Sequence, residues 1–178
     1  MNKNNKLEDS LNKIFTKSVY KMVDVSRKES THRKALATGE IILGPQVIQL
    51  IKEKKMPKGD PLLIAEVAGI NGAKKTSELI PLCHPLPLDH ISLHSEIDEK
   101  KYSIVVYCLV SANSKTGVEM EALSGVSSAL LAIYDLSKIV EPNLKITNTK
   151  LLVKSGGKKG LWINPDGIPD KIKNTLNL

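Results

Sequence analysis

Hydrophobic positions recur along the chain at two spacings, which predict where strands and helices lie. Apolar and polar residues alternate over ISLHSEI at 91–97, and DEKK then leads into YSIVVYCLV at 102–110. This pattern predicts two antiparallel strands joined as a hairpin. Shorter runs at 19–26 and 34–43 predict earlier strands, and LKITNTKLLV at 144–153 predicts the last one.

Three stretches carry helical patterns with recognisable ends. Pro45 stands at the first helical position of PQVIQLIKEKK, and Asp60-Pro61 supplies an N-cap and a first helical residue for a helix over 61–80. Pro81 ends that helix, and Pro142 closes a longer one over 118–140. The order β, α, α, ββ, α, β predicts an α+β fold, with helices packed against a largely antiparallel sheet.

Composition is typical of one soluble globular domain. The chain has 178 residues, 41% of them hydrophobic, and no apolar run reaches the ~18 residues needed to span a bilayer. We expect a flexible arm at 1–18, a single catalytic domain at 19–160 and a tail at 161–178. The start, MNKNNKLEDSLNKIF, lacks the apolar core of a secretory signal, and two cysteines make no disulfide framework. A cytoplasmic protein is expected.

Positive charge is concentrated toward the two ends of the sequence. The net charge is +7, yet the middle of the chain holds slightly more acids than bases. Basic clusters such as KSGGKKG at 154–160 favour partners that carry phosphate, although solvated lysines on the tails would give the same pattern. Aromatic residues make up 3% of the chain, which disfavours nucleic acid because few side chains could stack on bases.

A proline-rich loop, PLCHPLP at 81–87, follows the helix over 61–80. Cys83, His84, His90 and His94 contain a C-x6-H-x3-H spacing that superficially suggests zinc. His90 and His94 fall in a predicted strand, where four residues span ~13 Å, so one ion could not bind both. The loop is either a stiff segment that holds Cys83 and His84 in a pocket, or a helix stop with a packed cysteine.

The helix over 118–140 is apolar on most sides but carries charged residues. Asp135 and Lys138 stand three residues apart, so they are neighbours on one face. Exposed, such a pair contributes little to stability and carries no function. Partly buried, it would be suited to proton transfer. The sequence leaves both interpretations open.

Several long motifs together resemble one family. KKTSELIPLCHPL, TGVEMEALSGVSSALLAIYDLSK and LLVKSGGK, with MVDVS and KGD, are similar in order and spacing to the cyclic pyranopterin monophosphate synthases of molybdenum cofactor biosynthesis. The resemblance covers about residues 20–160. It implies conversion of 3′,8-cyclo-7,8-dihydro-GTP to cyclic pyranopterin monophosphate, with release of pyrophosphate.

The resemblance also implies an architecture and a set of site residues. We expect a ferredoxin-like subunit, a hexamer built as a trimer of dimers with sites at the dimer interface, a nucleotide-derived substrate, and no nucleic acid or membrane partner. No metal or other cofactor is implied, although Mg²⁺ could assist. The implied catalytic pair is Asp135 and Lys138, and the implied substrate-binding residues are Arg33, Lys58, Leu82, Cys83, His84, Glu119, Met120, Glu121 and Lys154.

Three alternatives remain from the residues. A basic nucleic-acid-binding module would explain the charge, and a metal-dependent hydrolase would use Cys83, His84 and His90. A member of the family that has lost activity is the third, and the presence of Asp135, Lys138 and His84 disfavours it. At position 150 the resemblance implies arginine more often than the lysine found here. Lys150 keeps the positive charge but lacks the planar guanidinium group that makes bidentate hydrogen bonds.

Overall fold

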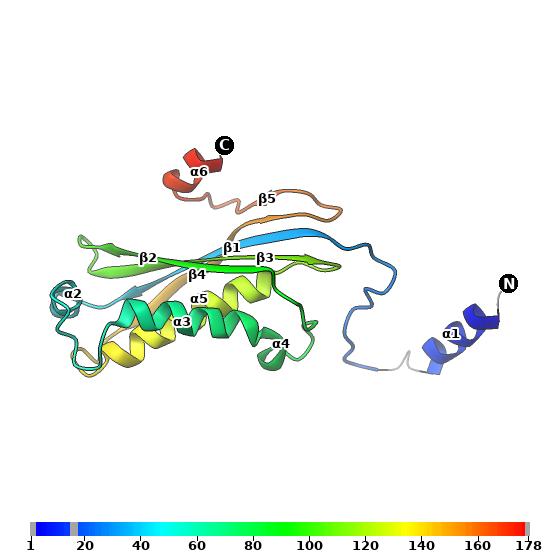
Figure 1. The fold of residues 1–178 in the computed structure, drawn as a ribbon, viewed down its shortest axis with the longest axis horizontal. Coiled ribbons are helices and arrows are strands. Elements are labelled where there is room, and N and C mark those ends of the chain that lie inside the picture. Colours follow the sequence, from blue (N-terminus) through cyan, green and yellow to red (C-terminus); the bar gives the residue numbers. More distant parts are fainter. Residues whose placement is uncertain (1–2, 15–17, 177–178) are drawn as a thin grey trace.

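The computed structural model describes residues 3–14 and 18–176, and its centre is a sheet covered by helices on one face (Figure 1). The strands are β1 (Thr31–Ile42), β2 (His90–Asp98), β3 (Ser103–Ser114), β4 (Lys145–Ser155) and β5 (Trp162–Ile163). The helices are α1 (Lys3–Ile14), α2 (Pro45–Lys52), α3 (Pro61–Lys74), α4 (Thr76–Leu79), α5 (Glu119–Ser137) and α6 (Asp170–Leu176).

The sheet has the order β2-β3-β1-β4-β5, and all its pairings are antiparallel. With α3 and α5 as the two crossover helices, the chain follows the β-α-β-β-α-β path of ferredoxin-like folds. The predicted α+β class and the predicted hairpin, now β2 and β3, are therefore confirmed. Figure 1 shows α3, α4 and α5 on one face of the sheet, and α6 on the other.

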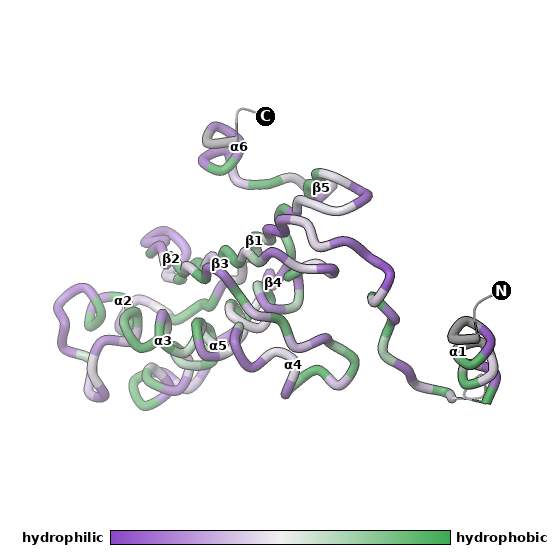
Figure 2. Tube along the Cα trace, turned by 45° about the vertical axis from the view of Figure 1, so that its right-hand side comes forward, coloured by the Kyte–Doolittle hydropathy of each residue, from purple (hydrophilic) through white to green (hydrophobic). Residues whose placement is uncertain are grey.

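The core lies between the sheet and helices α3 and α5. Alternate residues of β1 and β3 point into it, because successive side chains of a strand face opposite sides. The fully buried ones include Ala37, Ile41, Ile104, Val106, Cys108 and Val110, and α5 adds Val126, Leu130 and Ile133. Figure 2 shows apolar stretches in both helices, interrupted by polar ones.

Helices α3 and α5 run antiparallel along a seam of small residues. A Cβ added to Gly72 would lie 2.1 Å from the hydroxyl oxygen of Ser128, and one added to Gly125 would lie 2.6 Å from the sulfur of Cys108. Both contacts are far shorter than packed atoms allow, so larger side chains would force the elements apart. The small residues of this seam fix the spacing between α3, α5 and β3.

Three of the predicted elements differ from the structure. The strand predicted at 19–26 is wrong, because the Asp24 side chain accepts a hydrogen bond from the Ser26 amide at 2.8 Å and helps turn the chain there. The predicted helix over 61–80 ends at Lys74, and Thr76, the first residue of the short α4, donates its hydroxyl to the carbonyl of Ala73 at 2.9 Å. Helix α5 is shorter than the predicted 118–140.

The two ends of the chain hold more structure than the sequence indicated. The arm expected at 1–18 contains helix α1, while residues 1, 2 and 15–17 lie outside the described residues. Its flexibility stays a prediction. The tail contributes β5 and α6, and Ile168 is buried. Asn164 donates its side-chain amide to the carbonyl of Leu151 at 2.8 Å, which ties the tail to β4.

Candidate active site

Helix α5 carries charged residues at both ends. Glu119 and Glu121 lie in its first turn, whereas Asp135 lies near its last turn and Lys138 just after it. At 1.5 Å per residue, the helix separates Glu119 from Asp135 by about 24 Å. The structure therefore divides the predicted site residues into two groups. The N-end cluster comprises Arg33, Leu82, Cys83, His84, Glu119, Met120, Glu121 and Lys154, and the C-end cluster comprises Lys58, Asp135 and Lys138.

An ion pair joins strand β4 to helix α5 in the N-end cluster. The ammonium group of Lys154 lies 2.9 Å from Oε1 of Glu119, and both side chains are about one-third exposed. Carboxylates in the first turn of a helix are favourably placed, because the backbone amides there carry partial positive charge. Glu119 therefore holds Lys154 at the start of α5, and the partial positive charge of the first helical turn stabilises the Glu119 carboxylate.

Glu121 and Cys83 share a desolvated environment next to this ion pair. The Glu121 side chain is buried, and its burial raises the pKa of its carboxyl, with the nearby negative Glu119 adding to the effect. Burial also raises the pKa of the Cys83 thiol, and the charge of Glu121 raises it further. The thiol is therefore a poor nucleophile at neutral pH, whereas a carboxyl with a raised pKa is suited to exchanging protons.

The proline-rich loop is attached to the body of the protein at both ends. The Cys83 amide donates to the carbonyl of Ile80 at 3.0 Å. At the other end, the amide of Asp89 donates to the carbonyl of Ser111 at 3.0 Å, and its carboxylate accepts from the amide of Asn113 at 2.7 Å. Cys83 and His84 are half-buried and Leu82 is exposed. The loop thus presents three consecutive side chains from a fixed backbone.

Arg33 lies against the KSGG loop. Its guanidinium donates to the carbonyls of Ser114 at 3.4 Å and Lys115 at 3.5 Å. Gly157 has a φ of +70°, and a Cβ added there would lie 1.9 Å from an Arg33 guanidinium nitrogen. The glycine therefore provides both the left-handed backbone and the space that this arginine occupies.

A hollow of about 650 Å³, the basic basin, opens beside Lys154 and Arg33. Its lining contains eight basic and two acidic side chains, together with the glycines of the KSGG loop. A positive hollow with a glycine-rich wall is suited to a polyphosphate. Six of these bases were not among the residues predicted for the site, and the basic charge at the chain ends was an available signal for all of them except Lys115; they are Arg27, Lys28, Lys34, Lys115, Lys158 and Lys159.

The C-end cluster is an exposed group of three charges. The ammonium group of Lys138 lies 2.7 Å from one carboxylate oxygen of Asp135, and that of Lys58 lies 3.2 Å from the other. The hydrogen bond from Lys138, and to a smaller extent the one from Lys58, holds the pKa of Asp135 below its usual value. Asp135 in turn raises the pKa of Lys138. The three side chains are about half exposed. In a single chain, Asp135 and Lys138 therefore form a solvated pair and not the partly buried pair that would be suited to proton transfer.

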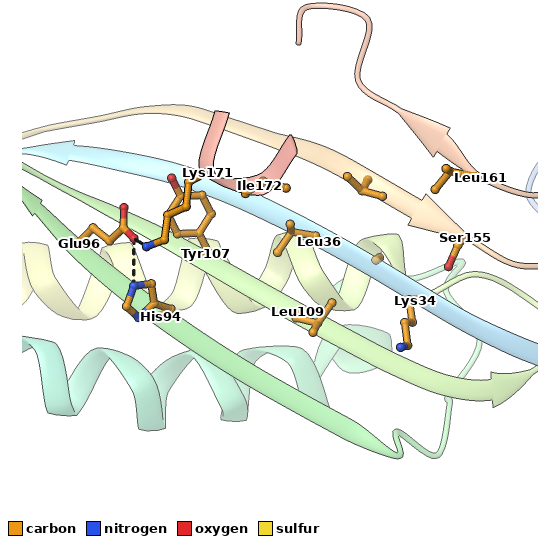
Figure 3. Close-up of a pocket in the computed structure, with 12 residues that line it drawn as sticks. Lys34, Leu36, His94, Glu96, Tyr107, Leu109, Ser155, Leu161, Lys171 and Ile172 are labelled. Atoms are coloured by element: carbon orange, nitrogen blue, oxygen red, sulfur yellow. Dashed lines mark hydrogen bonds and ion pairs between the residues drawn. The ribbon is translucent and has the colours of Figure 1, made fainter. Parts of the chain in front are cut away.

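A second hollow, of about 390 Å³, lies on the sheet face opposite α3 and α5 (Figure 3). Its lining is mostly apolar, and at one end Glu96 forms a hydrogen bond with His94 and an ion pair with Lys171. None of the residues predicted from the sequence lines it. The chemistry expected of this protein is therefore not placed there, even though this hollow is the more apolar of the two.

The described residues contain neither a metal-binding cluster nor a membrane-spanning helix. In residues 3–14 and 18–176, no three His, Cys, Asp or Glu side chains are grouped so as to hold a metal ion. Within the same part of the chain, no helix combines the length and the apolar character needed to cross a bilayer.

Comparison with known proteins gives consistent matches. A model of the MoaC family matches residues 22–157. The cyclic pyranopterin monophosphate synthase of Thermomicrobium roseum is 44% identical over 146 residues, which are 82% of this chain and 88% of that protein. The mitochondrial enzyme of the same name from Arabidopsis thaliana is 45% identical over 141 residues, 79% of this chain and 52% of that protein.

A longer relative matches over part of its length. The molybdenum cofactor biosynthesis bifunctional protein of Synechococcus elongatus is 46% identical over 149 residues, which are 84% of this chain. The alignment spans 47% of that protein, or about half its length.

Proposed function

The chain belongs to the MoaC family, and we propose that it acts as a cyclic pyranopterin monophosphate synthase in molybdenum cofactor biosynthesis. The reaction converts 3′,8-cyclo-7,8-dihydro-GTP to cyclic pyranopterin monophosphate and releases pyrophosphate. It needs proton-transfer groups at the purine-derived rings and positive charge at the triphosphate.

The observation that carries this proposal is the link between the basic basin and the turn of α5 that holds Glu121, whose charge also acts on Cys83. Lys154 lines the basin and pairs with Glu119, which begins the helical turn that also holds Glu121. A triphosphate bound in the basin would direct the rings of the substrate toward this turn. The basin thus supplies the cations, and Glu121, a buried carboxyl with a raised pKa, lies outside its lining, two residues beyond Glu119.

In this assignment each predicted residue has a place on the substrate. Lys154 and Arg33 contact phosphate oxygens, and Glu121 exchanges a proton at the ring end. The side chains of Leu82, Cys83, His84 and Met120 line the pocket for the rings, while Glu119 holds Lys154 in position. Asp135 and Lys138, with Lys58 beside them, complete the acid–base set. For this, the C-end cluster has to reach the substrate molecule that the N-end cluster binds.

A second copy of the chain would bring the C-end cluster to the substrate. Within one chain about 24 Å of helix separates the two clusters, so they cannot act on the same ring system. Apolar side chains are exposed on α3 and α5 between the clusters: Leu63, Ile64, Val67 and Leu131. Antiparallel packing of two such helix layers about a twofold axis would place the C-end cluster of one copy beside the N-end cluster of the other.

Burial by this second copy would also change the chemistry of Asp135 and Lys138. In one chain the pair is solvated, and at neutral pH both groups are charged. Removing water would weaken the preference of each group for its charged form and bring their protons into play. We assign the chain to a homo-oligomer, a hexamer made as a trimer of dimers, with its sites at the dimer interface.

The proposal assigns no resident metal or cofactor, because the lysines and arginines of the basic basin supply the positive charge. Mg²⁺ would enter with the phosphates of the substrate and could assist the departure of pyrophosphate. The cytoplasm is the proposed compartment, where Cys83 and Cys108 would stay reduced.

Pyrophosphate release from 3′,8-cyclo-7,8-dihydro-GTP tests the function directly. We expect turnover by the wild-type protein, and a loss of about 10²–10⁴-fold in Asp135→Asn and in Lys138→Met, the range typical of general acid–base groups. Circular dichroism would establish that both variants are folded. A folded wild-type protein that releases no pyrophosphate would contradict the proposal.

A further inference from the structure

The segment that enters β1 contributes two cations to the basic basin. Residues 18–30 form no helix or strand, and apart from Val25 their side chains are exposed. Hydrophilic residues dominate the part of this segment next to β1 (Figure 2). Arg27 and Lys28 nevertheless line the basin. Something must hold this exposed stretch, because ordering a free segment costs conformational entropy for every residue fixed.

Residues 24–28 form a turn with its own hydrogen bonds. The Asp24 carboxylate accepts from the Ser26 amide at 2.8 Å, and the Lys28 amide donates to the carbonyl of Val25 at 3.1 Å. These two bonds define the local conformation of the turn. A contact to one of its carbonyl groups would therefore help to fix where Arg27 and Lys28 lie.

Lys115 makes such a contact from the opposite wall of the basin. Its ammonium group donates to the carbonyl oxygen of Ser26 at 2.9 Å, joining residues 89 positions apart in the sequence. Lys115 follows directly on β3, and its own carbonyl accepts from the Arg33 guanidinium at 3.5 Å. A second hydrogen bond, from the Ser114 hydroxyl to the carbonyl of Thr116 at 2.6 Å, holds the backbone on either side of it.

We propose that Lys115 is a positioning residue that holds the turn at 24–28 against the basic basin, so that Arg27 and Lys28 reach the terminal phosphates of the substrate. The inference rests on the proposed function for the identity of that substrate. Lys115 acts through the carbonyl of Ser26. Its loss therefore does more than remove one positive charge from the basin, because it also releases the turn that carries Arg27 and Lys28.

Binding of inorganic tripolyphosphate, measured by isothermal titration calorimetry, tests this with a probe that needs no turnover. Lys115→Met should lose about tenfold or more in affinity, because a charge-assisted hydrogen bond and the placement of two cations are lost together. Lys159→Met is the matched control: it removes one exposed cation of the same basin and should lose about threefold at most. Lys115→Arg keeps a donor for the carbonyl and should restore most of the affinity.

Trypsin cleavage after Arg27 and Lys28, followed by mass spectrometry, reports the position of the turn. Cleavage should be faster in Lys115→Met than in wild type or Lys159→Met, and tripolyphosphate should protect the wild type. Loss of affinity without faster cleavage would assign Lys115 to direct phosphate contact and overturn the proposal. Equal behaviour of Lys115→Met and Lys159→Met, or a wild type that does not bind tripolyphosphate, would also overturn it.

Steady-state turnover separates this inference from the proposed function. Lys115→Met should raise KM about tenfold with little change in kcat, because the variant weakens phosphate binding and leaves the acid–base groups in place. A wild type that binds tripolyphosphate in a Lys115-dependent manner, yet does not turn over the cyclised dihydro-GTP, would refute the proposed function and leave the role of Lys115 standing.

Discussion

Glu119 and Lys154 form an ion pair of 2.9 Å that joins the first turn of α5 to the end of β4. Both residues line the basic basin, and the buried Glu121 follows two positions after Glu119 in the same helical turn. A phosphate that binds Lys154 must compete with the Glu119 carboxylate, which repels it. The ion pair therefore keeps Lys154 at the start of α5.

This arrangement predicts an unequal effect of single and double substitutions. Lys154→Met should raise KM about tenfold or more, since it removes a cation and leaves the Glu119 charge facing the phosphates. Adding Glu119→Gln should recover part of the loss, because the repulsion disappears. Steady-state pyrophosphate release from the four members of the cycle measures the coupling. A double variant no better than Lys154→Met would contradict an electrostatic role for Glu119.

Mixing two inactive variants tests whether the site is shared between copies. Asp135→Asn and Glu121→Gln remove groups from the C-end and N-end clusters respectively. If each site draws one cluster from each of two chains, random exchange of equal amounts should restore about a quarter of wild-type activity, through hybrid dimers with one intact site. Exchange would be verified by native mass spectrometry. Exchanged hybrids without activity would place both clusters in one chain.

Glu121 predicts a dependence of stability on pH. Its pKa is raised in the folded protein, so the proton is bound more tightly there than in the unfolded chain. Its contribution to the free energy of unfolding is complete below the unfolded pKa of about 4.3 and is lost as pH rises through the folded value. Glu121→Gln removes this loss, so the variant should gain stability over wild type between acidic and neutral pH, on the order of 1 kcal/mol.

Urea unfolding at pH 4 and at pH 7.5 measures this difference. Glu66→Gln, at an exposed position on α3, provides a control that should behave alike at both pH values. If the free energy of unfolding of Glu121→Gln does not rise relative to wild type as the pH increases, burying the ionised Glu121 carboxylate costs no stability.

Gly157 predicts a local effect on phosphate binding. Gly157→Ala and Gly160→Ala both place alanine at a positive φ, of +70° and +62°, and each should cost about 1 kcal/mol of stability. Only at Gly157 would the new Cβ meet Arg33; at Gly160 nothing lies within 4 Å. Gly157→Ala should therefore lose about tenfold in tripolyphosphate affinity, whereas Gly160→Ala should keep it. Equal affinities would mean that Arg33 moves aside without consequence for binding.

The elements that the sequence predicted correctly are those with strong local signals. Asp60 accepts hydrogen bonds from the amides of Leu62 and Leu63 at the start of α3, as its place before Pro61 indicated. The alternation in β2 and β3 likewise specified both the strands and their pairing. The apolar run at 19–26 gave a false signal, because Asp24 forms a turn and the segment joins no sheet ladder.

The sequence suggested candidate site residues but not how the fold groups them. The separation of Glu119 from Asp135 follows from their positions on one helix, yet only the fold shows that Lys58 joins Asp135 and that Lys154 joins Glu119. The basic basin could not be predicted, because its cations come from segments far apart in the sequence. No periodicity relates Lys115 to Ser26, although they are hydrogen-bonded.

The small-residue seam between α3 and α5 makes the helix pair a rigid spacer with one set of groups at each end. Lys58, just before α3, lies beside Asp135, while the loop that follows α4 lies beside Glu121. A slide of α3 by one turn, about 5.4 Å, would separate both pairs of groups at once. Gly72 and Gly125 therefore set a length, which in the proposed dimer would be the span that the second copy has to match.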